Sequence, residues 1–350
     1  MSSLAVLTVR NEGAFLLEWL AHHKAVGFTD FLVFSNDCQD GTDRMLDRLA
    51  ALGHLQHERN DGPHHARGIQ FTALNRASDL PLVRNSRWIL PLDIDEFVNI
   101  HTGDGTLDAL REALPEATAI TLTWRLFGNA GQVRYEDLPI LRTFTRCAPA
   151  IMHWPWRAAM FKTLHRNDGT YRKLGVHRPR DPDKARLAEA RWYDGEGRAL
   201  ESTFRTRRIF SPYGRPNHAL AQLNHYPLGA MESFVLKADR GRAVHSDHML
   251  GLDYWVERNW NDAEDTSIHR YAAVTDRLRA ELMADEELAA LHAQAVAWRK
   301  DRFDALMLEE PYRALFGRLL MAGPSRPVTP QAARFLTSHA NRARTAAPRD

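Results

Sequence analysis

Three carboxylates follow directly on an apolar run in residues 88–97, which read WILPLDIDEF. If this run is a strand, Asp93 and Asp95 share one of its faces, while Glu96 lies on the other, where structural pairing and catalysis are both open. Two converging carboxylates repel each other, and hard oxygen ligands suit Mg²⁺ or Mn²⁺. The spacing therefore predicts a divalent-metal site that completes its coordination with phosphate groups. A solvated loop, or carboxylates paired with arginine, would also explain the acidic cluster.

The chain before this acidic cluster alternates short strands with helices. The strand LAVLTV (4–9) is followed by a helical period that ends near Gly27, and FLVFS (31–35) by one that ends near Gly53. Such alternation predicts an α/β fold, with a Rossmann-like, mostly parallel sheet flanked by helices. Ligands of such sheets bind at the carboxyl ends of the strands, which is where the acidic cluster falls.

The pattern divides the chain into three parts. Residues 1–245 are predicted to form the α/β domain, whose first half, about 1–115, carries the alternation and whose second half, about 116–245, would complete the sheet and build a substrate wall. Residues 246–321 show the Leu and Ala periodicity of peripheral helices. Residues 322–350 are predicted to be a Pro-rich linker with a short basic tail, mostly solvated or disordered.

Composition excludes several classes of protein. Lys and Arg number 46 against 44 Asp and Glu, so the net charge of +2 gives no basis for a nucleic-acid partner. Two cysteines are too few for a disulfide framework, which fits a reducing compartment. No apolar run approaches the roughly 20 residues of a membrane span, and the N-terminus lacks the features of a signal peptide. We expect a cytoplasmic protein without a transmembrane segment, and leave peripheral work at a membrane open.

Three motifs, in this order, resemble the glycosyltransferase family 2-like proteins, in the branch near the family 92 transferases. They are LTVRNEGAFLLEWLAHHKAVGFTDFLVFSNDCQDGTDRML, WILPLDIDEFVNI and LNHYPLGAMESFVLKADRG. The resemblance covers roughly residues 4–245, and the ordered combination is more specific than any one motif. It implies a GT-A fold that binds a nucleotide-sugar donor, with a D-x-D motif that holds a divalent metal on the diphosphate.

On this resemblance, the ends of the first two strands line the nucleoside pocket. The residues expected there are Val9, Arg10, Asn11, Glu12, Asn36 and Asp37, with Gln70 facing the pocket from a helix. Glu12 is equally suited to starting a helix, and Gln70 to simple exposure. Asp40 and Thr42, in DGT before a helix, favour a capping role.

The resemblance also assigns the metal and phosphate ligands. Asp93 would contact the ribose or the metal, and Asp95 would be the principal metal ligand, with His225 or else His177 as a third. Lys237 and Arg240 would neutralise the departing diphosphate. A solvated basic helix face is the alternative for these two cations, and Arg172 and Lys173 are alternative phosphate ligands.

Inversion of the anomeric centre, which the resemblance suggests, needs a carboxylate that takes the proton of the acceptor hydroxyl. The candidates are Glu232 and Asp181, although Glu232 also suits a helix N-terminus and Asp181 a loop anchor. Trp154 or Trp156 could stack on the acceptor, with core packing as the alternative.

These residues together predict a metal-dependent glycosyltransferase. It would move a sugar from a UDP- or GDP-sugar to a glycan or lipid-linked acceptor, in polysaccharide or surface-glycan assembly. A sugar nucleotidyltransferase is disfavoured because TVRNEGAF (8–15) lacks a glycine-rich, basic loop. A catalytically degenerate scaffold is the remaining alternative.

Overall fold

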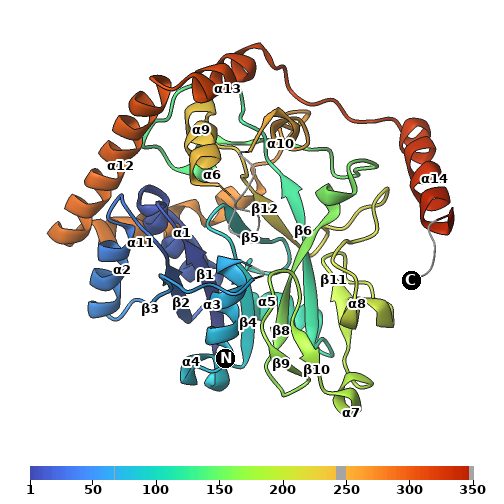
Figure 1. The fold of residues 1–350 in the computed structure, drawn as a ribbon. Coiled ribbons are helices and arrows are strands. Elements are labelled where there is room, and N and C mark those ends of the chain that lie inside the picture. The colour runs from blue at the N-terminus through green and yellow to red at the C-terminus, as the bar shows by residue number, and fades with distance from the viewer. Residues whose placement is uncertain (67, 242–249, 347–350) are drawn as a thin grey trace.

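A mixed sheet forms the centre of the molecule (Figure 1). The computed structural model describes residues 1–66, 68–241 and 250–346, and within them the sheet has nine strands. The strand order is β3-β2-β1-β4-β8-β6-β12-β5, and β11 pairs with β6. The strands are β1 (Ser3–Val9), β2 (Asp30–Ser35), β3 (Gln56–Arg59), β4 (Trp88–Leu92), β5 (Glu96–Ile100), β6 (Ala119–Leu126), β8 (Phe161–Arg166), β11 (Trp192–Asp194) and β12 (Ala221–His225). Within the described residues, two pairs of short strands lie outside it: β7 (Arg146–Cys147) pairs with β13 (Ala263–Glu264), and β9 (Tyr171–Lys173) with β10 (Arg180–Pro182).

The predicted α/β fold is confirmed, and the parallel order holds for the first four strands. Strands β3, β2, β1 and β4 all run parallel, whereas β8 runs antiparallel to both β4 and β6, and β5 runs antiparallel to β12. Only Asp93, Ile94 and Asp95 separate β4 from β5. Three residues are too few for the helical crossover that a parallel connection needs, so β5 cannot continue the parallel series.

Both faces of the parallel half are buried. Ala5, Leu7 and Val9 pack in one core cluster with helix α1, while Leu4 and Val6 pack in a second cluster with helix α3. A strand that is buried on both faces needs apolar residues at every position, which explains the run LAVLTV. The helices of this half are α1 (Gly13–Val26), α2 (Thr42–Ala51), α3 (Ile69–Ala77), α4 (Pro81–Asn85) and α5 (Leu107–Ala113).

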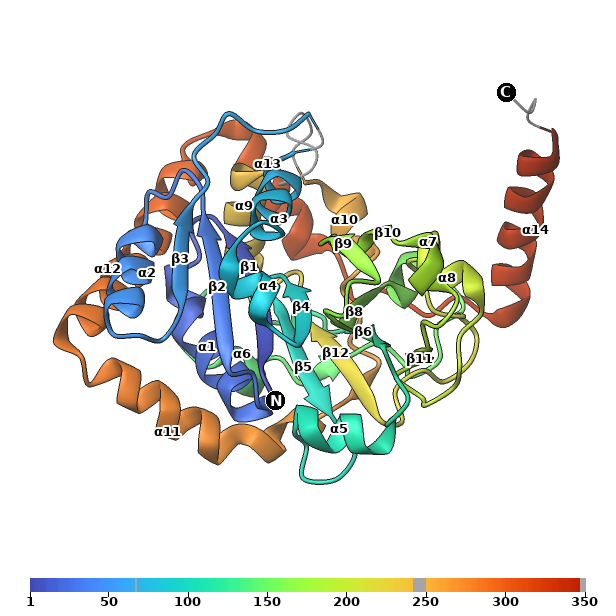
Figure 2. The same cartoon turned by 90° about the horizontal axis from the view of Figure 1, so that it is seen from below.

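The C-terminal helices pack against the first half of the chain. Figure 2 shows α11 and α12 on the same side of the sheet as α1 and α2, and α12 contacts α1, α2 and α9. Arg48 on α2 forms an ion pair with Asp285, which caps the start of α12. The remaining helices are α6 (Ile140–Thr143), α7 (Lys184–Leu187), α8 (Ser202–Thr206), α9 (Met231–Arg240), α10 (Leu252–Val256), α11 (Ala272–Met283), α12 (Glu286–Met307), α13 (Glu310–Met321) and α14 (Pro330–Ala346).

The end of the chain differs from the predicted solvated or disordered tail. Residues 330–346 form helix α14, which lies apart from the rest of the molecule in Figures 1 and 2. No glycine or proline interrupts residues 331–346, and alanine and arginine there are good helix formers. Side chains such as Phe335 remain exposed, so the expectation of solvation agrees with the structure while that of disorder does not.

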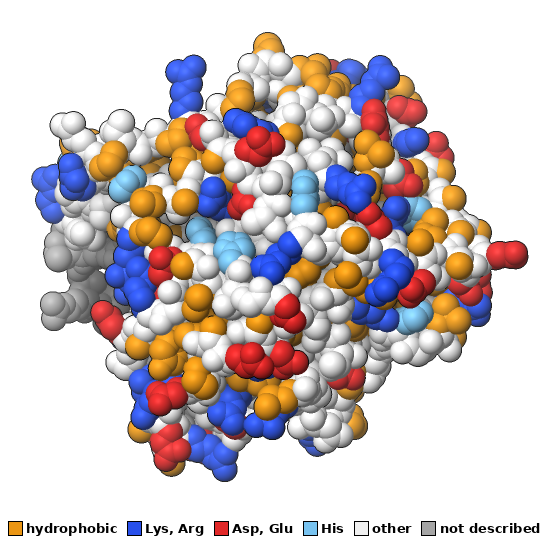
Figure 3. Space-filling model, turned by 180° about the vertical axis from the view of Figure 1, so that it is seen from behind, with side chains coloured by type: hydrophobic (Ala, Val, Ile, Leu, Met, Phe, Trp, Pro, Cys, Tyr) orange, Lys and Arg blue, Asp and Glu red, His pale blue; other side chains and the backbone are white. Residues whose placement is uncertain are grey.

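The surface is chemically mixed. Figure 3 shows Lys and Arg side chains interspersed with Asp and Glu over one face, without a continuous patch of one sign. Within the described residues, no helix combines the length and the apolar composition needed to cross a bilayer.

One buried carboxylate fixes the segment that precedes helix α6. Glu18 on α1 accepts hydrogen bonds from the backbone N–H groups of Ile140 at 2.8 Å and Leu141 at 3.2 Å. Burial raises the pKa of Glu18 to about 7, although the two backbone hydrogen bonds act in the opposite direction. This contact ties the segment around residues 132–144 to the first helix, and that segment forms one wall of the site described next.

Candidate active site

Two adjoining cavities open at the carboxyl ends of β1 and β4, where the sheet was predicted to bind its ligand. The larger cavity has a volume of about 920 Å³ and the smaller cavity one of about 550 Å³. Both are lined by the same six residues where they meet: Glu12, Ile94, Asp95, Lys237, Asp239 and Arg240. The D-x-D turn and the end of helix α9 therefore stand between the two spaces.

Most of the residues predicted from sequence meet at these cavities. The larger cavity is lined by Val9, Arg10, Glu12, Asn36, Gln70, Asp93, Asp95, His177, His225, Lys237 and Arg240. Asn11 lines the smaller cavity instead. Asp37 lines neither; it is exposed, and its N–H faces Asp61 at 3.4 Å.

Asp93 is held by two partners that use both of its oxygens. Gln70 donates to Oδ1 at 2.6 Å, and the ammonium of Lys162 lies 2.8 Å from Oδ2. Lys162 is fully buried, and it also lies 3.4 Å from Glu96. Burial alone would raise the pKa of Asp93, but the charge of Lys162 outweighs it, so the pKa lies below its ordinary value. Asp93 is thus an ion-paired anion with one partner at each oxygen.

The carboxylate of Glu96 bonds to neighbouring protein groups on the far side of the D-x-D turn. Its Oε1 accepts a hydrogen bond from the indole of Trp124 at 2.7 Å, and its Oε2 accepts one from the backbone N–H of Asp93 at 2.9 Å. Burial raises the pKa of Glu96 to about 8. The side chain holds the D-x-D turn closed and lines neither cavity. The turn itself departs from the strand expected over these residues, yet both aspartates still face the larger cavity.

Asp95 lies between a lysine and a histidine. Its Oδ2 is 2.7 Å from the ammonium of Lys237, and its Oδ1 is 3.7 Å from Nε2 of His225. Burial tends to raise the pKa of Asp95, but Lys237 and His225 hold it well below its ordinary range. Burial lowers the pKa of His225, which favours the neutral imidazole, and its Nδ1 is buried without a hydrogen-bond partner.

A second ion pair joins the first strand's loop to helix α9. The guanidinium of Arg240 contacts the carboxylate of Glu12 and donates to the backbone oxygen of Arg10 at 3.0 Å. Helix α1 does start after Glu12, but the side chain of Glu12 makes no capping hydrogen bond. Asp40 and Thr42 were predicted to cap the helix that follows DGT, but they also bond to the start of α1. Asp40 accepts from the N–H of Gly13 at 3.0 Å and from that of Thr42, the first residue of α2, at 2.9 Å, and Thr42 accepts from the N–H of Glu12 at 2.9 Å.

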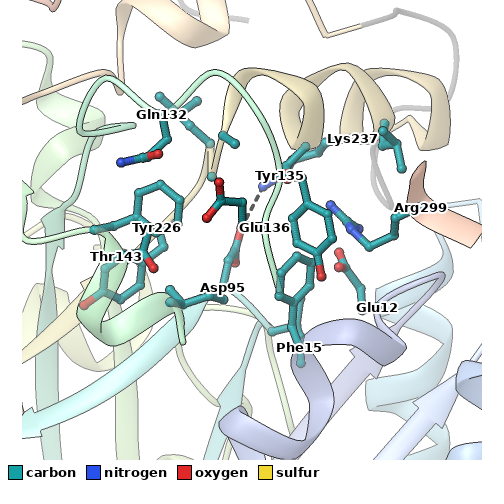
Figure 4. Close-up of a pocket in the computed structure, with 18 of the residues that line it drawn as sticks. Glu12, Phe15, Asp95, Gln132, Tyr135, Glu136, Thr143, Tyr226, Lys237 and Arg299 are labelled. Atoms are coloured by element: carbon teal, nitrogen blue, oxygen red, sulfur yellow. Dashed lines mark hydrogen bonds and ion pairs between the residues drawn. The ribbon is translucent and has the colours of Figure 1, made fainter. Parts of the chain in front are cut away.

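The smaller cavity combines motif residues with residues from two segments outside the motifs, which are residues 132–144 and helix α12. Figure 4 shows Phe15, Tyr135, Glu136 and Arg299 around it, with Glu136 directed into the same space as Asp95 and Lys237. Glu136 lies in the segment that Glu18 anchors, and Arg299 comes from helix α12. Sequence reasoning missed them because the segment carries no motif and α12 has the periodicity of a peripheral helix.

The two predicted bases lie outside both cavities. The carboxylate of Glu232 accepts a hydrogen bond from the backbone N–H of Tyr135 at 2.8 Å, which fixes the segment that carries Glu136. Asp181 lies on the short strand β10 and lines neither cavity. Trp154 and Trp156 also lie outside the two linings and pack against each other, with ring centroids 4.9 Å apart.

Comparison with known proteins gives one family match. The model of glycosyltransferase family 92 matches residues 6–187. A glycosyltransferase family 92 protein of Ricinus communis is 29% identical over 105 residues, which are 29% of this chain and 18% of that protein. The chain therefore aligns with less than a fifth of that relative's length.

Solved structures with some likeness to the chain include TarS of S. aureus. Its fragment 1–349 is 12% identical, with a TM-score of 0.33, over 90% of this chain and 92% of that one. The same fragment in complex with UDP is 13% identical, with the same TM-score and the same coverage.

Replacing Lys162 by methionine tests whether its ion pairs hold the turn. The change keeps much of the side-chain volume but leaves the partly buried carboxylate of Asp93 without its counterion. We expect the free energy of unfolding in urea to fall by roughly 3 kcal/mol, because a buried charge that loses its partner is strongly destabilising. Lys173→Met, which removes a partly exposed lysine, is the control and should change it by less than about 0.5 kcal/mol. Equal stability of both variants would contradict this role of Lys162.

Proposed function

The chain belongs to glycosyltransferase family 92, and from this premise we propose that it transfers a sugar from a nucleotide-sugar donor to an acceptor. The larger cavity would bind the donor and the smaller cavity the acceptor. One observation carries the proposal: the two cavities meet at Asp95 and Lys237, at the carboxyl ends of parallel strands. A shared wall of this kind would bring the leaving diphosphate and the attacking hydroxyl to one point.

The donor side supplies polar groups for a nucleotide. Asn36 follows β2, and the residues after β1 lead into the same space, so a base and ribose can reach both strand ends. Arg10 lines the larger cavity, and its Nε is buried without a hydrogen-bond partner. We propose that Arg10 and Lys237 bind the diphosphate of a UDP- or GDP-sugar.

A divalent metal is part of the proposal, with fewer ligands than the sequence predicted. In the residues that the structure describes, no group of three or more His, Cys, Asp or Glu side chains is arranged to hold a metal. Asp93 is committed to Gln70 and Lys162, but Asp95 Oδ1 and the neutral His225 face each other without a direct hydrogen bond. These two groups fit Mn²⁺ or Mg²⁺ with further ligands from the diphosphate. A metal there would add positive charge to that of Lys237 as the diphosphate leaves.

We assign the base of an inverting transfer to Glu136. Its carboxylate lines the smaller cavity and faces the D-x-D turn (Figure 4), and it has no hydrogen bond or ion pair in the described parts of the chain. A carboxylate in this position can accept the proton of an acceptor hydroxyl as the hydroxyl attacks the anomeric carbon. Glu232 would then act indirectly, by fixing the segment that carries Glu136. We also predict that the acceptor is a glycan or a lipid-linked sugar, and that the protein can act at a membrane surface.

The donor site is tested by titrating UDP and GDP into the protein in a calorimeter, with Mn²⁺ and with a chelator. We expect one nucleotide to bind, and Lys237→Gln to weaken it by about 10- to 100-fold, because a charge-assisted hydrogen bond is lost. Lys300→Gln, an exposed lysine on α12, is the matched control. Binding of neither nucleotide to the folded wild type would contradict the proposal. Equal nucleotide affinity with and without chelator would contradict the proposed role of a metal.

The base is tested by the rate at which the protein hydrolyses the donor that it binds. Glu136→Gln should lower this rate by about 100-fold or more, because water as acceptor needs the same proton transfer, and should leave nucleotide affinity unchanged. Glu112→Gln, on the exposed side of α5, is the control. If the Glu136→Gln variant hydrolyses the donor at the same rate as the control, Glu136 is not the base and another carboxylate must accept the proton.

A further inference from the structure

Arg299 is a buried cation without a counterion. It is 5% exposed and lines the smaller cavity, yet it makes no hydrogen bond or ion pair with any residue the structure describes, and its Nε is buried without a partner. The guanidinium packs against two aromatic rings, with centroid distances of 4.5 Å to Phe15 and 4.8 Å to Tyr135. These rings stabilise its charge but cannot accept the hydrogen bonds that its N–H groups offer.

The carboxylates nearest to the shared wall already have cationic partners. Glu12 contacts Arg240, Asp95 contacts Lys237, and Asp239 accepts two hydrogen bonds from Arg302 at 2.9 and 2.7 Å. Glu136 lines the same cavity, but it lies on the Asp95 side, away from Arg299 in Figure 4, and the two form no ion pair. The charge of Asp40 also acts on Arg299, but no carboxylate among the described residues forms an ion pair with its guanidinium.

A buried guanidinium without an ion pair in this position indicates an anionic ligand. Arginine stays protonated even when burial lowers its pKa, as it does here, so the charge cannot be removed by losing a proton. Taking such a charge out of water is unfavourable unless a partner replaces the lost hydration. A phosphate or a carboxylate would accept its N–H groups, and arginine binds both in a two-pronged geometry.

We propose that Arg299 binds an anionic group on the acceptor, so that the second substrate of this enzyme is a sugar or glycan bearing a phosphate or carboxylate. The inference rests on the proposed function and deepens it. The donor has its own unpaired cation, since Arg10 lines the larger cavity and not the smaller, whereas Arg299 lines the smaller and not the larger. Arg299 also lies outside the segment that the family match covers, so the family match does not assign this site.

The test compares three probes on the enzyme saturated with the nucleotide that it binds: glucose 6-phosphate, methyl glucuronide and the neutral methyl glucoside. We expect one of the two anionic probes to bind about tenfold or more tightly than the neutral probe, and Arg299→Met to abolish this difference. The better anionic probe distinguishes phosphate from carboxylate. Arg277→Gln, which removes an exposed arginine on α11, should behave as the wild type.

A stability readout separates anion binding from a structural role. Without added anion, Arg299→Met should melt at or above the wild-type temperature, because it removes an unpaired buried charge, and inorganic phosphate should stabilise the wild type more than the variant. Equal binding of all three probes, or no binding of any, would overturn the proposal. So would a weakened nucleotide affinity in Arg299→Met, which would move the residue to the donor. If the wild type binds no nucleotide, the proposed function itself fails, and phosphate stabilisation still reports on Arg299.

Discussion

The charge balance of the D-x-D turn is the constraint on which the site depends. Asp93 and Asp95 lie in a three-residue turn at the carboxyl end of β4. Each carboxylate forms an ion pair with a lysine from a distant segment of the chain. Lys162 comes from β8 and Lys237 from helix α9, so the two ion pairs tie the antiparallel strand and the helix to the parallel half of the sheet. Removing either lysine would leave a partly buried carboxylate without its partner.

This pairing also determines which cations are available to substrates. Each carboxylate of the shared wall is paired with a cation, whereas Arg10 and Arg299, which form no ion pair with a described residue, line one cavity each. A nucleotide diphosphate and an anionic acceptor would thus meet separate cations. On the proposed function, the donor and the acceptor would lie on opposite sides of Asp95, which is the geometry that a direct transfer between them needs.

Local patterns predicted the parallel half and its ligand edge, because strand and helix periods and strand-end motifs are encoded in neighbouring residues. His225 and Lys237 were placed beside Asp95 by the resemblance to the glycosyltransferases and not by a local pattern. The direction of β5 and β8 was not predictable, since pairing direction depends on contacts far apart in the chain. Lys162 was missed because four of the seven residues of MFKTLHR are polar, so the sequence does not mark this lysine as buried. Arg299 was missed because its cavity forms only when α12 packs on α1.

The central claim is that a nucleotide diphosphate binds beside Asp95 and Lys237. Its most direct test is a crystal structure of the protein with UDP or GDP, whichever binds, grown with Mn²⁺. The account predicts electron density for the diphosphate within hydrogen-bond distance of Lys237 and Arg10, and for the base near Asn36. A nucleotide found in the smaller cavity, or elsewhere on the surface with the larger cavity empty, would contradict it.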